Sequence, residues 1–153
     1  MAFELKSQAF KEGDLIPDKY TCEGPDVSPP LRWGDPLHRT RSFVLIADDP
    51  DAPMGTWVHW VIFNLPERQR DLPEGVPAQE TLPNGARQGL NDFKNAGYGG
   101  PCPPPGKPHR YYFRLYALDT MLDLKPRATK AKVLEACKGH ILAEAELMGR
   151  FGR

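Results

Sequence analysis

The chain has 153 residues, of which 17 are proline and 14 are glycine, and its 20 Lys and Arg residues balance its 20 Asp and Glu residues. Proline lacks an N–H and clashes with the preceding turn, so this excess excludes a helical bundle. The balanced charge excludes the basic surplus that is typical of nucleic-acid-binding proteins. Because 40% of the residues are hydrophobic, we expect one loop-rich globular domain over residues 1–153.

The distribution of apolar residues along the chain bears on where in the cell the protein is found. Glu4, Lys6 and Gln8 interrupt the apolar residues near the amino terminus, which therefore lacks the apolar stretch of a secretory signal. The longest uninterrupted apolar run, residues 43–47, is too short to cross a bilayer. We therefore expect a cytoplasmic protein without a membrane span.

Five segments predict β-strands separated by turns. The second of them contains two prolines, which restrict it to the edge of a sheet. The third and fourth are rich in β-branched and aromatic residues, which is typical of buried strands. Turn-forming residues dominate the stretch 67–108. The five segments are 3–10, 26–33, 42–47, 57–64 and 110–118.

The carboxyl-terminal segment predicts a helix. Thr129 is placed to cap a helix that runs to about Met148, where Gly149 would end it. Apolar residues at helical spacing define one face, which we expect to pack against the sheet. These residues are Leu134, Cys137, Ile141, Ala145 and Met148. The fold expected from these patterns is mainly β, closed by a carboxyl-terminal helix.

Two segments after the first buried strand carry candidate polar groups. Asp49 and Asp51 follow that strand directly, where carboxylates either bind something or stabilise a turn. In the next strand, alternation places Trp57 and His59 on one face and Val58 on the other, together with Trp60 and Ile62. Taken alone, His59 is typical of a histidine packed in a core.

A third segment is rich in glycine and proline. Gly99 and Gly100 precede Pro101 and a run of further prolines, and the next strand begins with His109 and Tyr111. Glycines let main-chain N–H groups approach a ligand, and consecutive amides can bind an anion. The alternative is a rigid connecting loop, but the nearby histidine and tyrosine favour a binding site.

Together these residues predict one pocket at the ends of neighbouring strands. Imidazole, phenol and amide groups suit a small anion such as a phosphate or a carboxylate. Trp57 would form an apolar wall, and Asp49 would orient a histidine or accept a hydrogen bond from the ligand. The polar groups are Asp49, His59, His109, Tyr111 and the main-chain amides of Gly99 and Gly100.

These motifs resemble the phosphatidylethanolamine-binding protein family, in particular its bacterial and archaeal branch, often described as Raf-kinase-inhibitor-like. The resemblance covers nearly the whole chain. It rests on Asp-Pro-Asp-Ala-Pro at 49–53, Trp-x-His at 57–59, and Gly-Gly-Pro-Cys-Pro-Pro leading to His-Arg-Tyr at 109–111. Further support comes from residues 22–24, 26–31, 91–93 and 139–143.

The resemblance implies an antiparallel β-sandwich with short helices and a surface pocket for phosphate-like groups and phospholipid headgroups. Asp49, Trp57, His59, Gly100, His109 and Tyr111 would line that pocket, while Asp51, Pro53 and Pro101 would brace its loops. It also implies a cis Ala52–Pro53 bond and a homodimer. The segment between Gly106 and His109 is shorter than in the animal members, so their signalling roles transfer poorly.

Three functions are compatible with these residues. The first is a non-catalytic protein that binds a small anion or a phospholipid headgroup and regulates other proteins. The second is a hydrolase or lyase that uses Asp49 with His59 or His109 as acid and base. The sequence contains no activated nucleophile and no metal motif, so we expect no catalytic residue, metal or cofactor. The third is an inhibitor that binds a kinase or a protease through its surface.

The three cysteines, Cys22, Cys102 and Cys137, include no CxxC pair and form neither a zinc signature nor a secreted disulfide framework. Cys22 and Cys102 both lie near the expected site, so the two side chains can approach one another. A disulfide requires their Cα atoms to be within about 7 Å. In a cytoplasmic protein, free thiols are the expectation.

Overall fold

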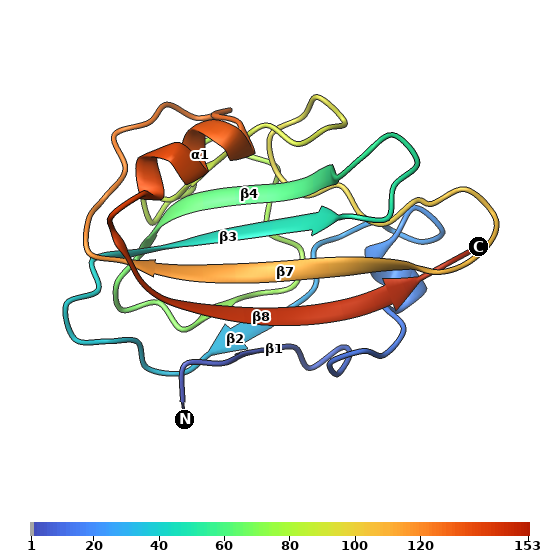
Figure 1. Ribbon diagram of the computed structural model, residues 1–153, viewed down its shortest axis with the longest axis horizontal. Helices are drawn as coiled ribbons and strands as arrows, with labels where there is room; N and C mark the ends of the chain where they lie inside the picture. Colours follow the sequence, from blue (N-terminus) through green and yellow to red (C-terminus); the bar gives the residue numbers. More distant parts are fainter. Residues whose placement is uncertain (1) are drawn as a thin grey trace.

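Two antiparallel sheets form the protein, for which a computed structural model describes residues 2–153 (Figure 1). The larger sheet has the order β6 (Arg87–Gln88), β4 (Trp57–Pro66), β3 (Ser42–Asp49), β7 (His109–Leu118), β8 (Ile141–Phe151). The smaller sheet has the order β1 (Leu5–Lys6), β2 (Leu31–Trp33), β5 (Asp71–Leu72). A 3-10 helix, η1, spans Asp18–Tyr20, and α1 spans Lys130–Cys137.

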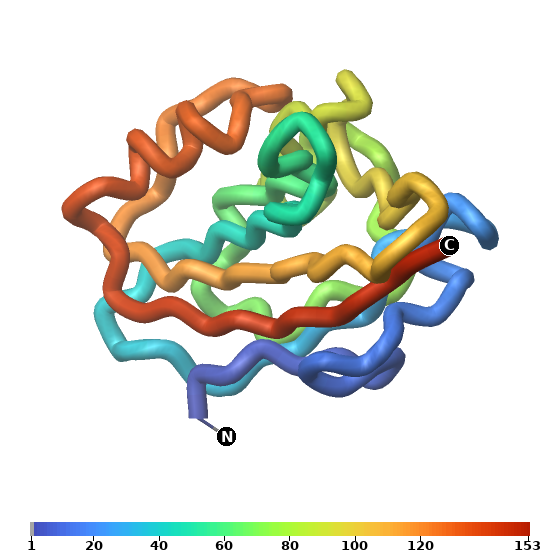
Figure 2. Tube along the Cα trace, turned by 45° about the vertical axis from the view of Figure 1, so that its right-hand side comes forward, coloured from blue at the N-terminus to red at the C-terminus, as the bar shows by residue number. Residues whose placement is uncertain are grey.

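The apolar side chains form two clusters, one on each face of the larger sheet. The first cluster fills the space between the two sheets and includes Phe43, Trp60 and Phe113. The second lies between the larger sheet and α1 and includes Val61 and Val133. Figure 2 shows the larger sheet between the helix on one side and the amino-terminal segments on the other. The expected mainly β architecture with two antiparallel sheets is confirmed.

The three long central strands agree closely with the sequence-based expectation. Burial of all eight residues of β3 explains the unbroken apolar pattern of that segment, because both faces of the strand are covered. The first strand is much shorter than expected and spans only Leu5–Lys6. Two short strands, β5 and β6, lie within the stretch that we expected to consist of turns.

The sequence-based prediction of a long carboxyl-terminal helix is wrong. Thr129 does cap α1, because its Oγ1 accepts a hydrogen bond from the N–H of Lys132 at 3.2 Å. The helix ends at Cys137, however, and Gly139 adopts a φ of 79°, a conformation that glycine adopts without strain and that often ends helices. Residues 141–151 then form β8, which pairs with β7 along its whole length.

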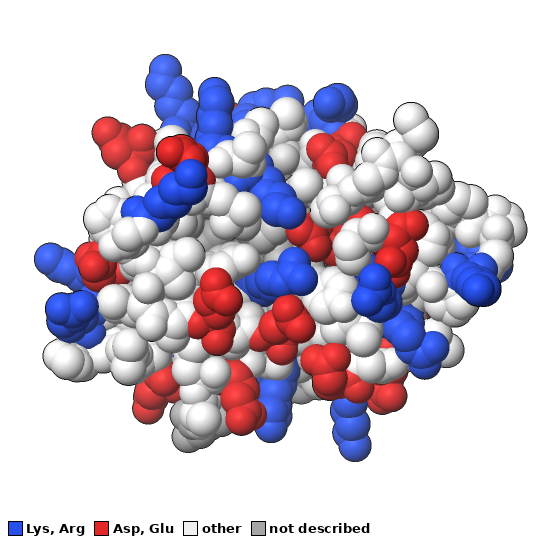
Figure 3. Space-filling view, in the orientation of Figure 1, with Lys and Arg blue, Asp and Glu red and all other residues white. Residues whose placement is uncertain are grey.

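The helices of the structure bear on membrane insertion. Among residues 2–153, no helix combines the length and the apolar character that crossing a membrane requires. The face shown in Figure 3 carries interspersed acidic and basic side chains, in keeping with the balanced net charge.

Candidate ligand-binding site at one end of the larger sheet

A cavity of about 220 Å³ lies at the end of the larger sheet where β3 ends and β4 and β7 begin, the right-hand end of Figure 1. Five of its lining residues were expected to line it: Asp49, Trp57, His59, His109 and Tyr111. Pro53, which was expected to brace a loop, also lines it. Five others were not named as lining residues: Ala52, Phe93, Cys102, Pro103 and Pro104. The cavity thus combines carboxylate, imidazole and phenol groups with apolar walls.

Asp49 and His109 form a buried pair at the polar side of the cavity. Nδ1 of His109 donates to Oδ2 of Asp49 at 2.7 Å, and the Asp49 side chain is only 4% exposed. The other carboxylate oxygen, Oδ1, accepts a hydrogen bond from the main-chain N–H of Asp51 at 2.7 Å. Both oxygens of Asp49 therefore have protein partners, and the ring of His109 is held by its Nδ1 atom.

His59 enters the cavity because β4 contains a bulge. Ala47 pairs with Trp60, whereas Asp48 pairs with Val58, so His59 is an extra residue in β4. As a result His59 lines the cavity, while Trp60 packs between the sheets and Val58 packs on the α1 side. The expectation that Val58 and Trp60 share a face is therefore wrong, because strict alternation does not hold across a bulge.

The ring of His59 is also held through Nδ1, which lies 2.6 Å from the carbonyl oxygen of Gly99. A carbonyl oxygen only accepts hydrogen bonds, so Nδ1 carries the hydrogen. Burial lowers the pKa of His59 below 6.5, although the bond to Gly99 and the charge of Asp49 partly oppose this effect. The ring is therefore neutral at pH 7, and its Nε2 is an acceptor.

Aromatic rings pack around His59. The ring of Tyr111 lies 5.3 Å from it, and Phe93 contacts both Trp57 and His59 with centroid distances of 5.5 Å. Burial raises the pKa of the Tyr111 hydroxyl, and the carboxylate of Asp49 raises it further, so Tyr111 stays protonated. Phe93 was missed because it lies in a turn region with no periodic pattern.

Gly99 and Gly100 do not supply free amides to the cavity, so this part of the expectation is wrong. The N–H of Gly99 donates to the carbonyl oxygen of His59 at 2.9 Å, and that of Gly100 donates to Oδ1 of Asp26 at 2.8 Å. Their lack of a side chain serves packing instead. A Cβ on Gly99 would lie 2.5 Å from the ring of Phe93, and one on Gly100 would overlap the main chain of Tyr20.

The loops around the cavity are tied down by polar contacts. Asp51 lies outside the cavity lining and binds Arg110 through both carboxylate oxygens, at 2.8 and 3.0 Å, and this hydrogen bonding lowers the pKa of Asp51 to about 2. Pro101 is buried outside the lining, and its carbonyl oxygen accepts a hydrogen bond from the N–H of Cys22 at 3.1 Å. The Ala52–Pro53 bond is trans, so the cis bond implied by the resemblance is not present.

A disulfide joins Cys22 to Cys102, with a Cα–Cα distance of 5.3 Å. The expectation of three free thiols is therefore wrong for this pair, while Cys137 is unpaired and buried. The sequence places the two cysteines 80 residues apart, so only the fold shows that their loops meet. Because Cys102 lines the cavity, the disulfide anchors one wall of the candidate site.

The fold and the cavity define a β-sandwich protein with a histidine-containing cavity at one end of its larger sheet. The chain belongs to the phosphatidylethanolamine-binding protein family, which it matches over residues 6–152.

Named relatives agree with this assignment. The chain is 54% identical to a UPF0098 protein of Methanothermobacter thermautotrophicus over 149 residues, which covers 97% of this chain and 98% of that one. It is 44% identical to a phosphatidylethanolamine-binding protein homologue from Chlamydia trachomatis, with a TM-score of 0.91 and 99% and 98% of the two chains covered. It is 34% identical to Escherichia coli YbcL, with a TM-score of 0.92 and 100% and 99% covered.

Proposed function

We propose that this protein binds, without catalysis, a phosphate group or a phosphorylated headgroup in the cavity, and that this binding regulates another protein such as a kinase or a protease. One observation carries the proposal. His59 and His109 line the same cavity, and each is held to the protein through Nδ1. Among residues 2–153, neither ring has a protein partner at Nε2, so both Nε2 atoms remain for a ligand.

The ring of His59 favours a ligand that donates a hydrogen bond. The neutral ring of His59 accepts a hydrogen at Nε2. The ring of His109 lies against the carboxylate of Asp49, which accepts the hydrogen of Nδ1. A phosphate that still carries a proton fits the acceptor on His59, because it has an O–H. Sulfate has no O–H at neutral pH, so it cannot donate to Nε2 of His59.

Thermal denaturation tests this proposal. Millimolar inorganic phosphate or phosphoethanolamine should raise the Tm of the wild type, and sulfate at the same ionic strength should raise it less. His59→Ala and His109→Gln should both reduce the phosphate effect. His140→Ala is the matched control, because His140 pairs with Asp119 at 2.7 Å beyond the opposite end of β7. No shift of the wild-type Tm with phosphate would contradict the proposal.

A hydrolase or lyase is the second candidate, and the buried Asp49–His109 pair favours it. A histidine oriented by a carboxylate is a common general acid or base. Turnover of a panel of phosphate esters, lost in Asp49→Asn but retained in His140→Ala, would support this function over simple binding. We expect no turnover, since the residues that line the cavity include no serine, threonine or lysine and their one cysteine is in the disulfide.

A further inference from the structure

The outer edge of β8 is covered along only part of its length. The main chain of segment 13–16 bonds to the main-chain groups of Met148 and Arg150 at 2.7 to 2.9 Å. Alternate residues of a strand direct their N–H and C=O groups to the same side, so those of Glu144 and Glu146 also point outward. Among residues 2–153, these outward groups have no main-chain partner. This half of the edge is open to a further strand.

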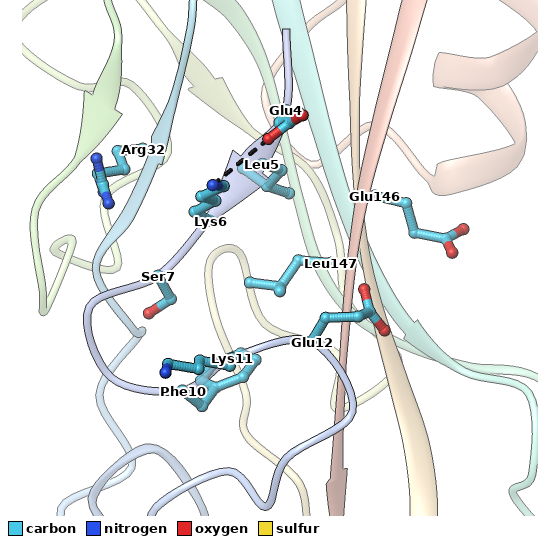
Figure 4. A pocket seen from close by; sticks show the side chains of 10 residues that line it. All are labelled: Glu4, Leu5, Lys6, Ser7, Phe10, Lys11, Glu12, Arg32, Glu146 and Leu147. Atoms are coloured by element: carbon cyan, nitrogen blue, oxygen red, sulfur yellow. Dashed lines mark ion pairs between the residues drawn. The ribbon is translucent and has the colours of Figure 1, made fainter. Parts of the chain in front are cut away.

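A hollow of about 500 Å³ lies beside the open edge, between β8 and β1 (Figure 4). Its floor is apolar and consists of Leu5, Phe10 and Leu147, which are all buried. Figure 4 shows the basic side chains on one side of this hollow and Glu12 and Glu146 on the other. The basic residues are Lys6, Lys11 and Arg32.

An added strand would present its side chains alternately to the hollow and to the outer face of the sheet. Side chains opposite Ala145 and Leu147 would reach the apolar floor, because these two residues face the core. Side chains opposite Glu144 and Glu146 would meet carboxylates on the outer face, where acidic groups gather over β8 in Figure 3. Oε1 of Glu146 forms an ion pair with Nε of Arg114 at 3.0 Å, whereas Glu144 makes no ion pair within residues 2–153.

From this geometry we propose that the open edge of β8 binds an extended segment of a partner protein in which basic and apolar residues alternate. Main-chain hydrogen bonds to Glu144 and Glu146 supply the pairing, and the side chains supply the specificity, as in other strand additions. A second copy of this chain is a poor occupant, because antiparallel pairing of two β8 edges brings the glutamates of both copies together. This surface is separate from the cavity of the proposed function.

Fluorescence anisotropy with a labelled synthetic peptide that alternates lysine and valine tests the proposal at low salt. The wild type should bind this peptide and not its glutamate–valine counterpart. Glu144→Lys should weaken binding by roughly threefold to tenfold, because it replaces an attractive cross-strand pair by a repulsive one. Glu135→Lys is the matched control, since Glu135 is an exposed residue of α1 and the change of charge is the same.

Two further measurements test the strand pairing itself. Glu144→Pro removes an outward N–H that takes no part in the β7–β8 ladder, which an edge strand tolerates, and it should abolish binding. In the wild type, amide hydrogen exchange at Glu144 and Glu146 should slow when the peptide binds, a result that does not depend on the folding of any variant. Equal binding by Glu144→Pro, or protection elsewhere only, would overturn the proposal.

Two other outcomes would also overturn it. If no peptide binds at millimolar concentration, the two glutamates serve only to prevent the edge of β8 from pairing with a strand of another chain. If the wild type forms a dimer in sedimentation experiments and Glu144→Pro disrupts it, the edge belongs to a second copy of the chain.

Discussion

His59 and Gly99 are joined by two hydrogen bonds in opposite directions. Nδ1 of His59 donates to the Gly99 carbonyl oxygen at 2.6 Å, and the N–H of Gly99 donates to the His59 carbonyl oxygen at 2.9 Å. These bonds connect the bulge of β4 to the glycine-rich loop. They therefore determine both the position of the loop and the ring nitrogen that faces the cavity.

The buried, neutral ring of His59 should make the protein acid-sensitive. Its pKa is lowered from 6.5 by burial in the folded state, so the unfolded chain binds this proton at a higher pH than the folded chain. The free energy of unfolding should therefore be highest above about pH 6.5 and fall as the pH decreases toward the lowered pKa. Urea unfolding between pH 7.5 and 5 measures this slope.

His59→Gln is the comparison for that experiment, because glutamine does not titrate. The variant should be less stable than the wild type at neutral pH and should show a flatter dependence on pH. An unchanged slope would mean that the ring is not held neutral by burial.

Alanine at the two adjacent glycines should have unequal effects. On Gly100, a Cβ would overlap the oxygen of Tyr20, a main-chain atom that cannot turn aside as a side chain can. On Gly99, it would meet only the ring of Phe93, which is 39% exposed and able to rotate. Gly100→Ala should therefore cost about 1–3 kcal/mol of stability, typical of overpacking, and Gly99→Ala should cost less. Urea unfolding of both variants measures the difference, and the reverse order would contradict this account of the loop.

The Cys22–Cys102 disulfide predicts one free thiol, that of Cys137. Thiol titration of the denatured, unreduced protein should therefore give one group per chain and not three. Cys22→Ser should lower the free energy of unfolding by about 2–4 kcal/mol, because the bond constrains a long loop in the unfolded chain. Cys137→Ala, which leaves the disulfide intact, is the control for the thiol count and should titrate no group at all.

The Asp51–Arg110 contact should contribute stability only above strongly acidic pH. Hydrogen bonding to Arg110 lowers the pKa of Asp51 from 3.8 to about 2, so the folded chain keeps this carboxylate ionised where the unfolded chain protonates it. The contribution should be fully present above about pH 4 and lost as the pH falls toward about 2. Asp51→Asn should be less stable than the wild type at pH 5, and the difference should narrow near pH 2. A constant difference would contradict this assignment.

The candidate site could be predicted in part from the sequence. Asp49, His59 and His109 each belong to a short motif beside a recognisable strand, so their types and spacing were informative. The bonding of the glycine amides could not be predicted, because the acceptor of Gly100 is Asp26, 74 residues away. Phe93 was missed for a similar reason, since only the folding of its loop brings it to the cavity wall.

The sequence by itself determined the balance of apolar and polar residues, the three long central strands and the Thr129 cap, because each depends on neighbouring residues. Only the tertiary structure decided that residues 141–151 form a strand. Ala, Glu, Leu and Met favour helices when considered locally, yet Ala143, Ala145 and Leu147 also alternate with polar residues at the period of a strand. The free edge of β7 selected the strand, since pairing along its whole length supplies hydrogen bonds and core contacts that an isolated helix would not make.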